Sequence, residues 1–364
     1  MKPALDRIPP GVHSLADYAR IAADHIDEAT LAHIEGGTGD ELSLDANRDA
    51  FDSLRLYNRV LADCTAGSTR LTLLGEALDH PILLAPVALH RLVHPGGEIA
   101  TARGALDTLM VASTLSSDPL EDIARHAAGP LWFQLYFQPR REDTLHLVRR
   151  AEAAGYTAIM ATLDAPLQTP GRRALLAGFR LGVDHQPANL AGQAPLPQVA
   201  LAPGSSMIFQ GMMREAPGWA DLEWLLGQTR LPVLAKGVTH PADARRLIDL
   251  GIAGIVVSNH GGRALDGMPP ALDAIGPIRA IAGPAYPLLL DGGIRSGAHV
   301  FKALACGADA VMVGRPQLHA LAVAGSLGVA HMLKLLREEL EITMALAGCP
   351  TMRDITSDAL FKLG

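Results

Sequence analysis

The segment SNHGGRALD (258–266) places an imidazole, His260, two glycines away from a guanidinium, Arg263. An imidazole is well suited to general base catalysis near neutral pH, and a guanidinium is well suited to binding a carboxylate. The intervening glycines let the backbone approach a bound molecule closely. This pattern predicts that His260 removes a proton from a substrate whose carboxylate Arg263 holds. The alternative is a purely structural role for His260.

Two more polar side chains, Tyr136 and Asp164, end the apolar runs LWFQLY (131–136) and AIMATLD (158–164). A carboxylate beside an imidazole can fix its orientation and stabilise its charged form. We therefore expect Asp164 to orient His260 and to stabilise the imidazolium. Capping of the following turn is the alternative role for Asp164.

Lys236 ends the otherwise apolar run PVLAKG (232–237). A lysine is rarely buried without a negatively charged partner. A bound ring that becomes anionic would supply that partner, and we favour this interpretation for Lys236. A salt bridge to Asp291 is the alternative.

Paired glycines and arginines follow the last two apolar runs, in DGGIRSG (291–297) and GRP (314–316). Glycine pairs let backbone N–H groups approach an anion, and Arg295 and Arg315 can add charge-assisted hydrogen bonds. If these segments follow strands seven and eight of a barrel, they lie where such barrels commonly bind phosphate. The sequence therefore predicts a phosphate site here.

These residues need a scaffold that brings the ends of separate strands together. From residue 81 onward, short apolar runs alternate with polar or Gly-rich turns and amphipathic segments, such as the helices expected at 140–154 and 241–250. This alternation is typical of parallel strands joined by helices, and eight such units favour a (β/α)₈ TIM barrel. The expected strands lie at 81–87, 109–114, 131–136, 158–164, 232–237, 254–260, 288–293 and 310–315.

We expect a single domain that spans residues 1–364. Residues 1–80 are expected to form an N-terminal helical extension, 81–320 the barrel, and 321–364 a C-terminal helix and tail. The interval 174–219, after strand four, is rich in Pro, Gly, Ala and Gln and predicts a long loop. A hydrophobic membrane anchor is the competing interpretation, although no basic cluster flanks this segment.

Composition excludes several classes of partner. The chain has 364 residues, a formal net charge of −7 and three cysteines without metal-binding spacing. Such a charge predicts no nucleic-acid partner, and the cysteine spacing predicts no bound metal. We expect no signal peptide, because the first residues lack the apolar run that one needs, and no membrane span, because no uncharged run reaches the required length. We therefore expect a cytoplasmic enzyme without stable membrane association, whose partner is a small molecule.

Taken together, the motifs resemble one family, the FMN-dependent 2-hydroxy acid oxidases and dehydrogenases, which includes glycolate oxidase, lactate oxidase and mandelate dehydrogenase. The resemblance covers nearly the whole chain, and SNHGGR followed by DGG and GRP is its most specific part. The matching segments are DANRDAF (45–51), APVALHRLVHPGGE (85–98), WFQLY (132–136), TLDAP (162–166), GRR (171–173), KGV (236–238), SNHGGRALD (258–266), DGGIRSG (291–297), GRP (314–316) and TMALAGC (343–349).

The resemblance implies FMN as cofactor and a role for each matching residue. His260 would be the base while the flavin N5 atom accepts electrons, Arg263 and Arg173 would hold the substrate carboxylate, and Tyr136 would bond the reacting oxygen. Lys236 would stabilise the reduced flavin near its N1–C2 edge. The remaining implied FMN contacts are Val87, Ala88, Ser116, Gln134 and Thr162 at the ring, Ser258 and Asp291 at the ribityl chain, and Gly292, Gly293, Arg295, Gly314 and Arg315 toward the phosphate.

Three departures from the family pattern concern the substrate. His33, in LAHIEGG (31–37), stands where glycolate oxidase-like members have a tyrosine that helps to bind the carboxylate. His33 either takes over this contact or caps a helix. The segment 113–122 is shorter than its counterpart and lacks the pocket tryptophan, which implies a roomier pocket for a branched or aromatic acid. Two extra residues in 165–173 shift the approach to Arg173.

The resemblance implies oxidation of a small (S)-2-hydroxy acid to the 2-oxo acid. We favour an oxidase that passes electrons to O₂ and yields H₂O₂, and the homotetramer that is frequent in the family. One alternative is a dehydrogenase that reduces a quinone or a cytochrome. Others are a flavin barrel with altered specificity, such as an isomerase, and a flavin-binding protein without activity.

Overall fold

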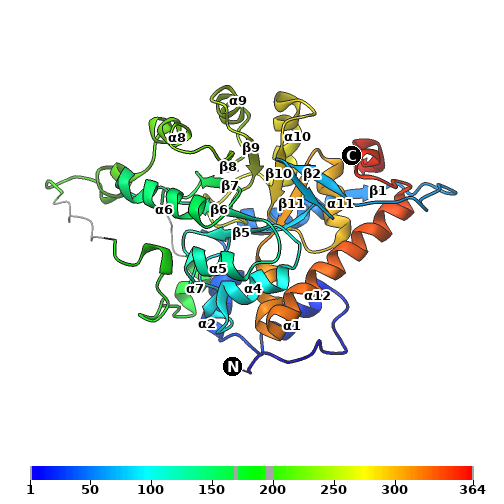
Figure 1. Cartoon of the computed structure of the whole chain (residues 1–364), viewed down its shortest axis with the longest axis horizontal. Helices are drawn as coiled ribbons and strands as arrows, with labels where there is room; N and C mark the ends of the chain where they lie inside the picture. The colour runs from blue at the N-terminus through cyan, green and yellow to red at the C-terminus, as the bar shows by residue number, and fades with distance from the viewer. Residues whose placement is uncertain (1, 168–170, 194–200, 363–364) are drawn as a thin grey trace.

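At the centre of the computed structural model, which describes residues 2–167, 171–193 and 201–362, eight parallel strands close into a barrel (Figure 1). The strands follow one another around the barrel in chain order, and β11 closes it against β4 through the pair Val311 and Ile82. All eight expected strands are confirmed, and so is the TIM barrel. The strands are β4 (Ile82–Leu84), β5 (Met110–Ser113), β6 (Leu131–Leu135), β7 (Ala158–Thr162), β8 (Val233–Val238), β9 (Gly254–Val257), β10 (Leu288–Asp291) and β11 (Ala310–Val313).

The strands read as continuous apolar runs because they are buried on both faces. One set of alternating side chains, including Trp132, Met160 and Leu289, fills the barrel interior and is fully buried. The other set packs against the surrounding helices. The inside of the barrel is therefore a packed core.

Helices surround the barrel and alternate with its strands. The two helices singled out in the sequence are confirmed to within one residue at each end, as Arg141–Ala153 and Pro241–Asp249. The second begins with a proline at its first turn, after the capping side chain of His240. The outer helices are α4 (Gly97–Ala105), α5 (Leu120–His126), α6 (Arg141–Ala153), α8 (Trp219–Leu226), α9 (Pro241–Asp249), α10 (Ala271–Ala282), α11 (Gly297–Ala305) and α12 (Arg315–Ala347).

The N-terminal extension contains helices, as expected, and also short strands that were not expected. Strands β2 and β3 form a hairpin whose Leu73 and Leu78 pack onto the interior cluster of the barrel. Strand β1 pairs with β12 at the other end of the chain, which lies beside it in Figure 1. The elements are α1 (Leu15–Ala22), α2 (Glu28–Glu35), α3 (Leu42–Ser53), β1 (Leu54–Leu56), β2 (Leu71–Leu73), β3 (Glu76–Leu78) and β12 (Leu360–Lys362).

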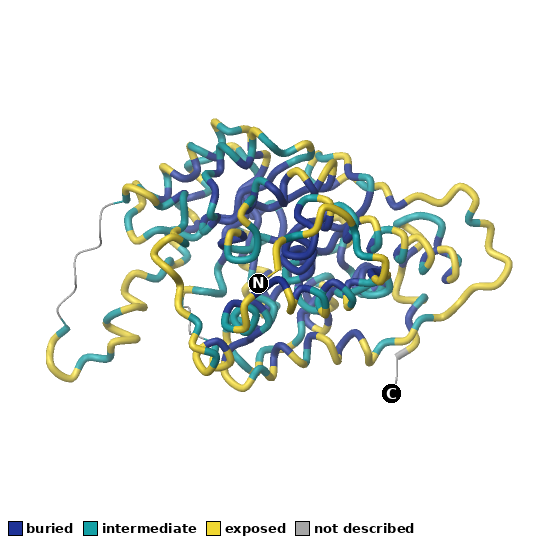
Figure 2. The backbone as a smooth tube through the Cα atoms, turned by 90° about the horizontal axis from the view of Figure 1, so that it is seen from below, coloured by how far each residue is buried: buried dark blue, intermediate teal, exposed yellow. Residues whose placement is uncertain are grey.

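The segment between β7 and α8 departs from the barrel rhythm, as predicted for 174–219. It holds α7 (Arg172–Leu176) and the short helical turns η2 (Ala188–Leu190), η3 (Met207–Gly211) and η4 (Met212–Glu215). Its parts 168–170 and 194–200 lie outside the described residues. The remaining parts are mostly exposed, in contrast to the buried barrel (Figure 2).

The closing helix α12 starts at Arg315, earlier than the C-terminal segment expected from residue 321, and bends at Ala324 and Gly325, whose backbone angles are not helical. It packs against α1, α4 and α11. Of the described helices, only α12 is long and apolar enough to cross a membrane by length and composition. Its most apolar stretch is 67% buried, as in the core helix of a folded domain, so α12 is weak support for a membrane span.

Candidate active site

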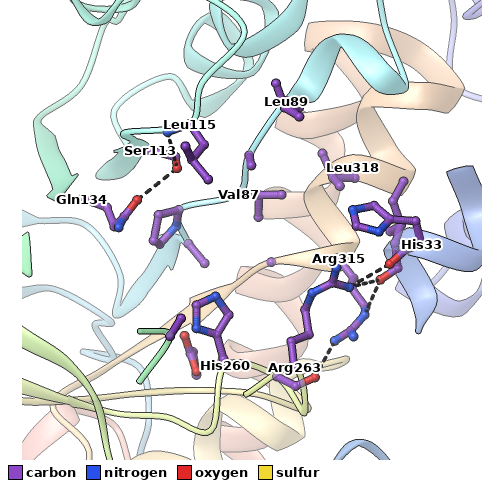
Figure 3. Close-up of a pocket in the computed structure, with 18 of the residues that line it drawn as sticks. His33, Val87, Leu89, Ser113, Leu115, Gln134, His260, Arg263, Arg315 and Leu318 are labelled. Atoms are coloured by element: carbon purple, nitrogen blue, oxygen red, sulfur yellow. Dashed lines mark hydrogen bonds between the residues drawn. The ribbon is translucent and has the colours of Figure 1, made fainter. Parts of the chain in front are cut away.

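A cavity of about 510 Å³ opens at the C-terminal ends of the barrel strands (Figure 3). This is the end of the barrel where active sites are built. Most of the predicted site residues line this cavity, including the candidate base and the glycines of both segments expected to bind phosphate. They are His33, Val87, Ala88, Gln134, Tyr136, Thr162, Lys236, His260, Arg263, Asp291, Gly292, Gly293, Arg295, Gly314 and Arg315.

His260 is oriented by Asp164. Its Nδ1 atom lies 2.9 Å from Oδ1 of Asp164, and its Nε2 atom lies 3.5 Å from the Tyr136 hydroxyl oxygen. A carboxylate at Nδ1 favours the tautomer with its proton on that nitrogen, which leaves the lone pair of Nε2 directed toward Tyr136 and the cavity. This arrangement suits a general base, as predicted from the sequence.

Asp164 is nearly fully buried and does not itself line the cavity. Burial alone would raise the pKa of Asp164, but the charges of His260 and Lys236 outweigh it and lower the pKa below its usual value. A side chain at Gly237 would place its Cβ 2.3 Å from the Asp164 carboxyl carbon. The glycine after Lys236 therefore leaves room for the carboxylate behind His260.

Lys236 is buried at the end of β8, with Nζ 3.2 Å from Oδ2 of Asp291 and 3.2 Å from Oγ of Ser258. Burial would lower the pKa of Lys236, but Asp291 and Asp164 outweigh it and raise the pKa. The lysine is thus charged, it lines the cavity, and it also forms the salt bridge named as the alternative. Oδ1 of Asp291 is buried without a hydrogen-bond partner among the described residues, so it can accept one from a ligand hydroxyl.

Ser258 lies outside the cavity lining, contrary to the expected contact with a ribityl chain. Its side chain is fully buried because its oxygen is used twice inside the protein. It accepts hydrogen bonds from Nζ of Lys236 and from the backbone N–H of His260, the latter at 2.9 Å. Ser258 thus connects the buried lysine to the backbone of the base.

Arg263 attaches the C-terminal turn of α2 to the cavity. Its Nη1 atom donates to the carbonyl oxygens of His33 at 2.7 Å and Gly36 at 3.0 Å. Such carbonyls at a helix C-terminus lack partners within the helix and attract a cation. Arg263 is therefore held firmly at the cavity wall, where its guanidinium can meet a carboxylate.

Arg315 binds the same turn of α2 from the phosphate side. It donates to the carbonyl oxygens of Ile34 at 2.8 Å and Gly36 at 2.8 Å. Burial lowers the pKa of Arg315 to about 9, and the neighbouring charges of Arg263 and Arg295 add to this effect. Buried cations that repel one another at a cavity wall are stabilised when an anion binds beside them.

The glycines at this end of the barrel let a bound group approach the backbone closely. Gly292 and Gly293 have φ angles of 92° and 85°, which favour glycine. A Cβ atom on Gly293 would lie 2.4 Å from the carbonyl oxygen of Asn47 in α3. Together with the guanidinium of Arg295, also buried, this cradle fits the predicted phosphate group.

His33 does not cap α2, because Gly36 occupies the C-cap position. Its imidazole lines the cavity and stacks on the ring of Phe179, with ring centroids 4.1 Å apart and an angle of 4° between the planes. Burial lowers the pKa of His33 to about 4, and Arg263 and Arg315 contribute to the shift. His33 is therefore uncharged at neutral pH. Phe179 was missed in the sequence because no local pattern connects it to α2.

Arg173 lies outside the cavity lining, unlike the carboxylate-binding position expected for it. Its guanidinium forms an ion pair with Glu41, and its side chain is about half exposed. The neighbouring Ala174 and Leu175 do line the cavity. The carboxylate of Glu41 competes for Arg173, and this partner, 132 residues away, could not be recognised in the sequence.

Ser116 also lies outside the cavity lining, where a flavin contact was expected. Its buried hydroxyl donates to the carbonyl oxygen of Ser113 at 2.6 Å. Ser113 itself lines the cavity and donates to Oε1 of Gln134 at 3.0 Å, while Nε2 of Gln134 donates to Thr162 at 3.0 Å. The polar residue at this position is Ser113 because β5 ends there, three residues before the expected contact.

No group of three or more His, Cys, Asp or Glu side chains in residues 2–167, 171–193 and 201–362 could hold a metal ion.

With this fold and site, the chain belongs to the family of FMN-dependent dehydrogenases, whose pattern matches residues 22–362. It is 57% identical to L-lactate oxidase of Alicycliphilus denitrificans, with 98% of each chain covered. It is 44% identical to 4-hydroxymandelate oxidase of Amycolatopsis orientalis, over 93% of this chain and 95% of the relative. The crystal structure of mandelate oxidase superposes with a TM-score of 0.87 at 41% identity and covers 97% of this chain and 99% of that one.

Family membership confirms the resemblance and identifies FMN as the cofactor. The residues that line the cavity fit this group in their chemistry. The cradle of glycines and buried arginines suits its phosphate, and the unpartnered oxygen of Asp291 suits a ribityl hydroxyl. Val87, Ala88, Ser113, Gln134, Thr162 and Lys236 are the residues that would hold its ring.

Proposed function

We propose that this protein oxidises a small (S)-2-hydroxy acid to the 2-oxo acid with FMN and then passes the electrons to O₂, which yields H₂O₂. One observation carries the proposal: the imidazole of His260, oriented by Asp164, shares a cavity with the guanidinium of Arg263. The relatives named above, all oxidases of 2-hydroxy acids by name, support the same reaction.

In the proposed reaction, Arg263 binds the substrate carboxylate and thereby fixes which face of the substrate meets His260. Nε2 of His260 takes up a proton from the substrate. Asp164 stabilises the resulting imidazolium without a change of its own charge. The Tyr136 hydroxyl bonds the substrate oxygen that becomes the oxo group. FMN, when bound, would supply the acceptor for the two electrons and the second hydrogen that the substrate loses. Arg173 could reach the carboxylate only after its ion pair with Glu41 has opened.

We further propose a substrate with an apolar side chain. The part of the cavity wall that the segment after β7 contributes includes the apolar side chains Leu175, Phe179 and Leu181. Burial of an apolar side chain there is favourable, whereas glycolate would gain nothing from this wall. The names of the relatives, which include lactate and mandelate oxidases, support such a substrate.

The cellular setting is also a proposal. We propose a cytoplasmic homotetramer without stable membrane association and without a nucleic-acid partner. Three cysteines without a disulfide, Cys64, Cys306 and Cys349, support a reducing compartment. The family resemblance supports the tetramer, which sedimentation equilibrium of the purified protein would test.

An anaerobic titration tests the proposed activity. L-Lactate, (S)-mandelate and glycolate are added separately to the purified yellow protein in the absence of O₂, and the flavin absorbance is followed. We expect bleaching by L-lactate or (S)-mandelate, with recovery within seconds in air. Bleaching that persists in air but is reversed by a quinone would show a dehydrogenase. A flavin that no 2-hydroxy acid bleaches would refute the proposed reaction.

A further inference from the structure

Glu98 is a fully buried carboxyl group that the mechanism above does not use. It lies in the first turn of α4 and accepts hydrogen bonds from three backbone N–H groups outside that helix. Oε1 accepts from His90 at 3.0 Å and from Ser117 at 3.0 Å, and Oε2 accepts from Asp118 at 3.2 Å. One side chain thus joins the β4–α4 loop (85–96) to the β5–α5 loop (114–119).

A second buried carboxyl group, Asp118, reinforces the connection in the opposite direction. It belongs to the β5–α5 loop, yet it accepts from the backbone N–H of Ile99 at 3.2 Å and forms an ion pair with Arg91. The backbone N–H of Leu89 also donates to the carbonyl oxygen of Leu115 at 3.1 Å. The two loops are therefore cross-linked at several points.

The cross-linked loops form one wall of the cavity. Val87, Ala88 and Leu89 from the first loop line it, as does Leu115 from the second. Leu89 adopts a φ angle of 55°, in the left-handed region that a leucine rarely occupies. The first stretch leads into one short helical turn, η1 (His90–Leu92), and the hydrogen bonds of Glu98 and Asp118 connect both stretches to α4.

Two opposing effects act on the pKa of Glu98. Burial raises the pKa of Glu98 to about 7, while the N–H groups of His90 and Ser117 act in the opposite direction. The position at the N-terminus of α4 also favours the carboxylate. The partners of its carboxyl group are backbone N–H groups. The nearby cation, Arg91, pairs with Asp118 instead.

We propose that Glu98 is a positioning residue for FMN, which acts through the backbone of residues 87–90 and 115–118 to hold the cavity wall against the flavin ring. The proposal rests on FMN binding alone. It is therefore independent of the substrate and of the electron acceptor.

The test uses the FMN-bound protein and the variant Glu98→Gln, which keeps the size of the side chain but turns one acceptor into a donor that faces the N–H of Asp118. The matched control is Asp309→Asn. Asp309 likewise accepts a backbone hydrogen bond, from Leu288 at 2.8 Å, but it lies at the opposite end of the barrel. For each variant we measure the dissociation constant of FMN, the positions of the flavin absorption bands and the thermal midpoint.

We expect Glu98→Gln to weaken FMN binding by about fivefold or more, as expected when a buried donor loses its partner, and to shift the absorption bands. Asp309→Asn should lower the thermal midpoint without either effect. Equal FMN affinities and equal spectra in the two variants would overturn the proposal, because Glu98 would then be merely structural.

If Glu98→Gln does not fold, amide hydrogen exchange in the wild-type protein provides the test. The wall held by Glu98 should be protected at residues 87–92 and 113–118 both with FMN and after its removal. Protection of these amides only in the presence of FMN would show that the cofactor orders the wall, and would overturn the proposal.

Discussion

The Nδ1 atom of His260 lies 2.9 Å from Oδ1 of Asp164, although 96 residues separate the two in the chain. The contact forms because β7 and β9, which precede these residues, flank β8 in the barrel. It is accommodated by Gly237, at the end of β8, which leaves space for the carboxylate. The barrel thereby places Asp164 where it can orient His260 as a base.

The first prediction concerns Asp164. Asp164→Asn retains the shape of the side chain but removes the charge that stabilises the imidazolium, so flavin reduction by the substrate should slow about 10²- to 10⁴-fold. FMN affinity should change little, since Asp164 does not line the cavity. Rapid mixing under anaerobic conditions measures the rate. A rate within threefold of wild type would show that Asp164 is only a structural residue.

Lys236 should set the reduction potential of the flavin. Lys236→Met removes a buried positive charge from the cavity wall, and an anionic reduced ring would lose its stabilisation. We expect the two-electron potential to fall by about 30 mV or more, measured by equilibration with a reference dye. Lys302→Met is the control, because Lys302 bonds the carbonyl oxygen of Phe51 outside the cavity. Equal potentials in both variants would contradict this role.

The stacked pair of His33 and Phe179 should select the substrate side chain. Loss of the ring in Phe179→Ala should lower kcat/KM for (S)-mandelate by about tenfold or more, and for L-lactate by less, because more apolar area loses its contact. Leu176→Ala is the control on the same segment, since Leu176 is 79% exposed. A change of equal size for both substrates in Phe179→Ala would mean that the pair does not select by side chain.

The buried His90 predicts a dependence of stability on pH. Its Nδ1 atom lies 2.8 Å from Oγ1 of Thr101, and burial lowers its pKa to about 4, from 6.5 in the unfolded chain. As the pH falls, the unfolded state binds this proton first, so the free energy of unfolding decreases between about pH 6.5 and pH 4. Between pH 7 and pH 5 this one group accounts for a loss of about 2 kcal/mol.

Urea unfolding at pH 7 and pH 5 measures this loss. The variant His90→Asn should be less stable overall but should lose less stability than wild type between the two pH values. His13→Asn, in which an exposed histidine is replaced, should retain the wild-type dependence on pH. If wild type and His90→Asn lose the same free energy of unfolding between pH 7 and pH 5, the imidazole of His90 is not kept neutral by burial.

The barrel could be predicted from the sequence because each strand is a local apolar run buried on both faces. The pairing of β1 with β12 could not, because each has three residues and the two lie at opposite ends of the chain. Residues at strand ends, such as His260 and Lys236, were correctly expected to face one cavity. Ser116 was expected at the cavity, but the serine that lines the cavity is Ser113, where β5 ends one residue earlier than expected.

Contacts between distant segments account for the other differences between the expectations from the sequence and the structure. Nothing in the local sequence of Arg173 indicates its ion pair with Glu41, and nothing near His33 indicates its stack on Phe179. Glu98 belongs to a matching segment, but its partners are backbone N–H groups, which no residue pattern reveals. Such roles depend on the folded backbone and become visible only in the structure.

The central claim is that His260 is the base of a 2-hydroxy acid oxidase. The most direct measurement compares wild type with His260→Ala, both loaded with FMN and mixed anaerobically with L-lactate or (S)-mandelate, whichever bleaches the wild type. We predict that the variant binds FMN with near wild-type affinity and that its flavin is reduced about 10²- to 10⁴-fold more slowly. Reduction of the variant at a rate close to that of wild type would contradict the account, because the proton would then be removed by another group.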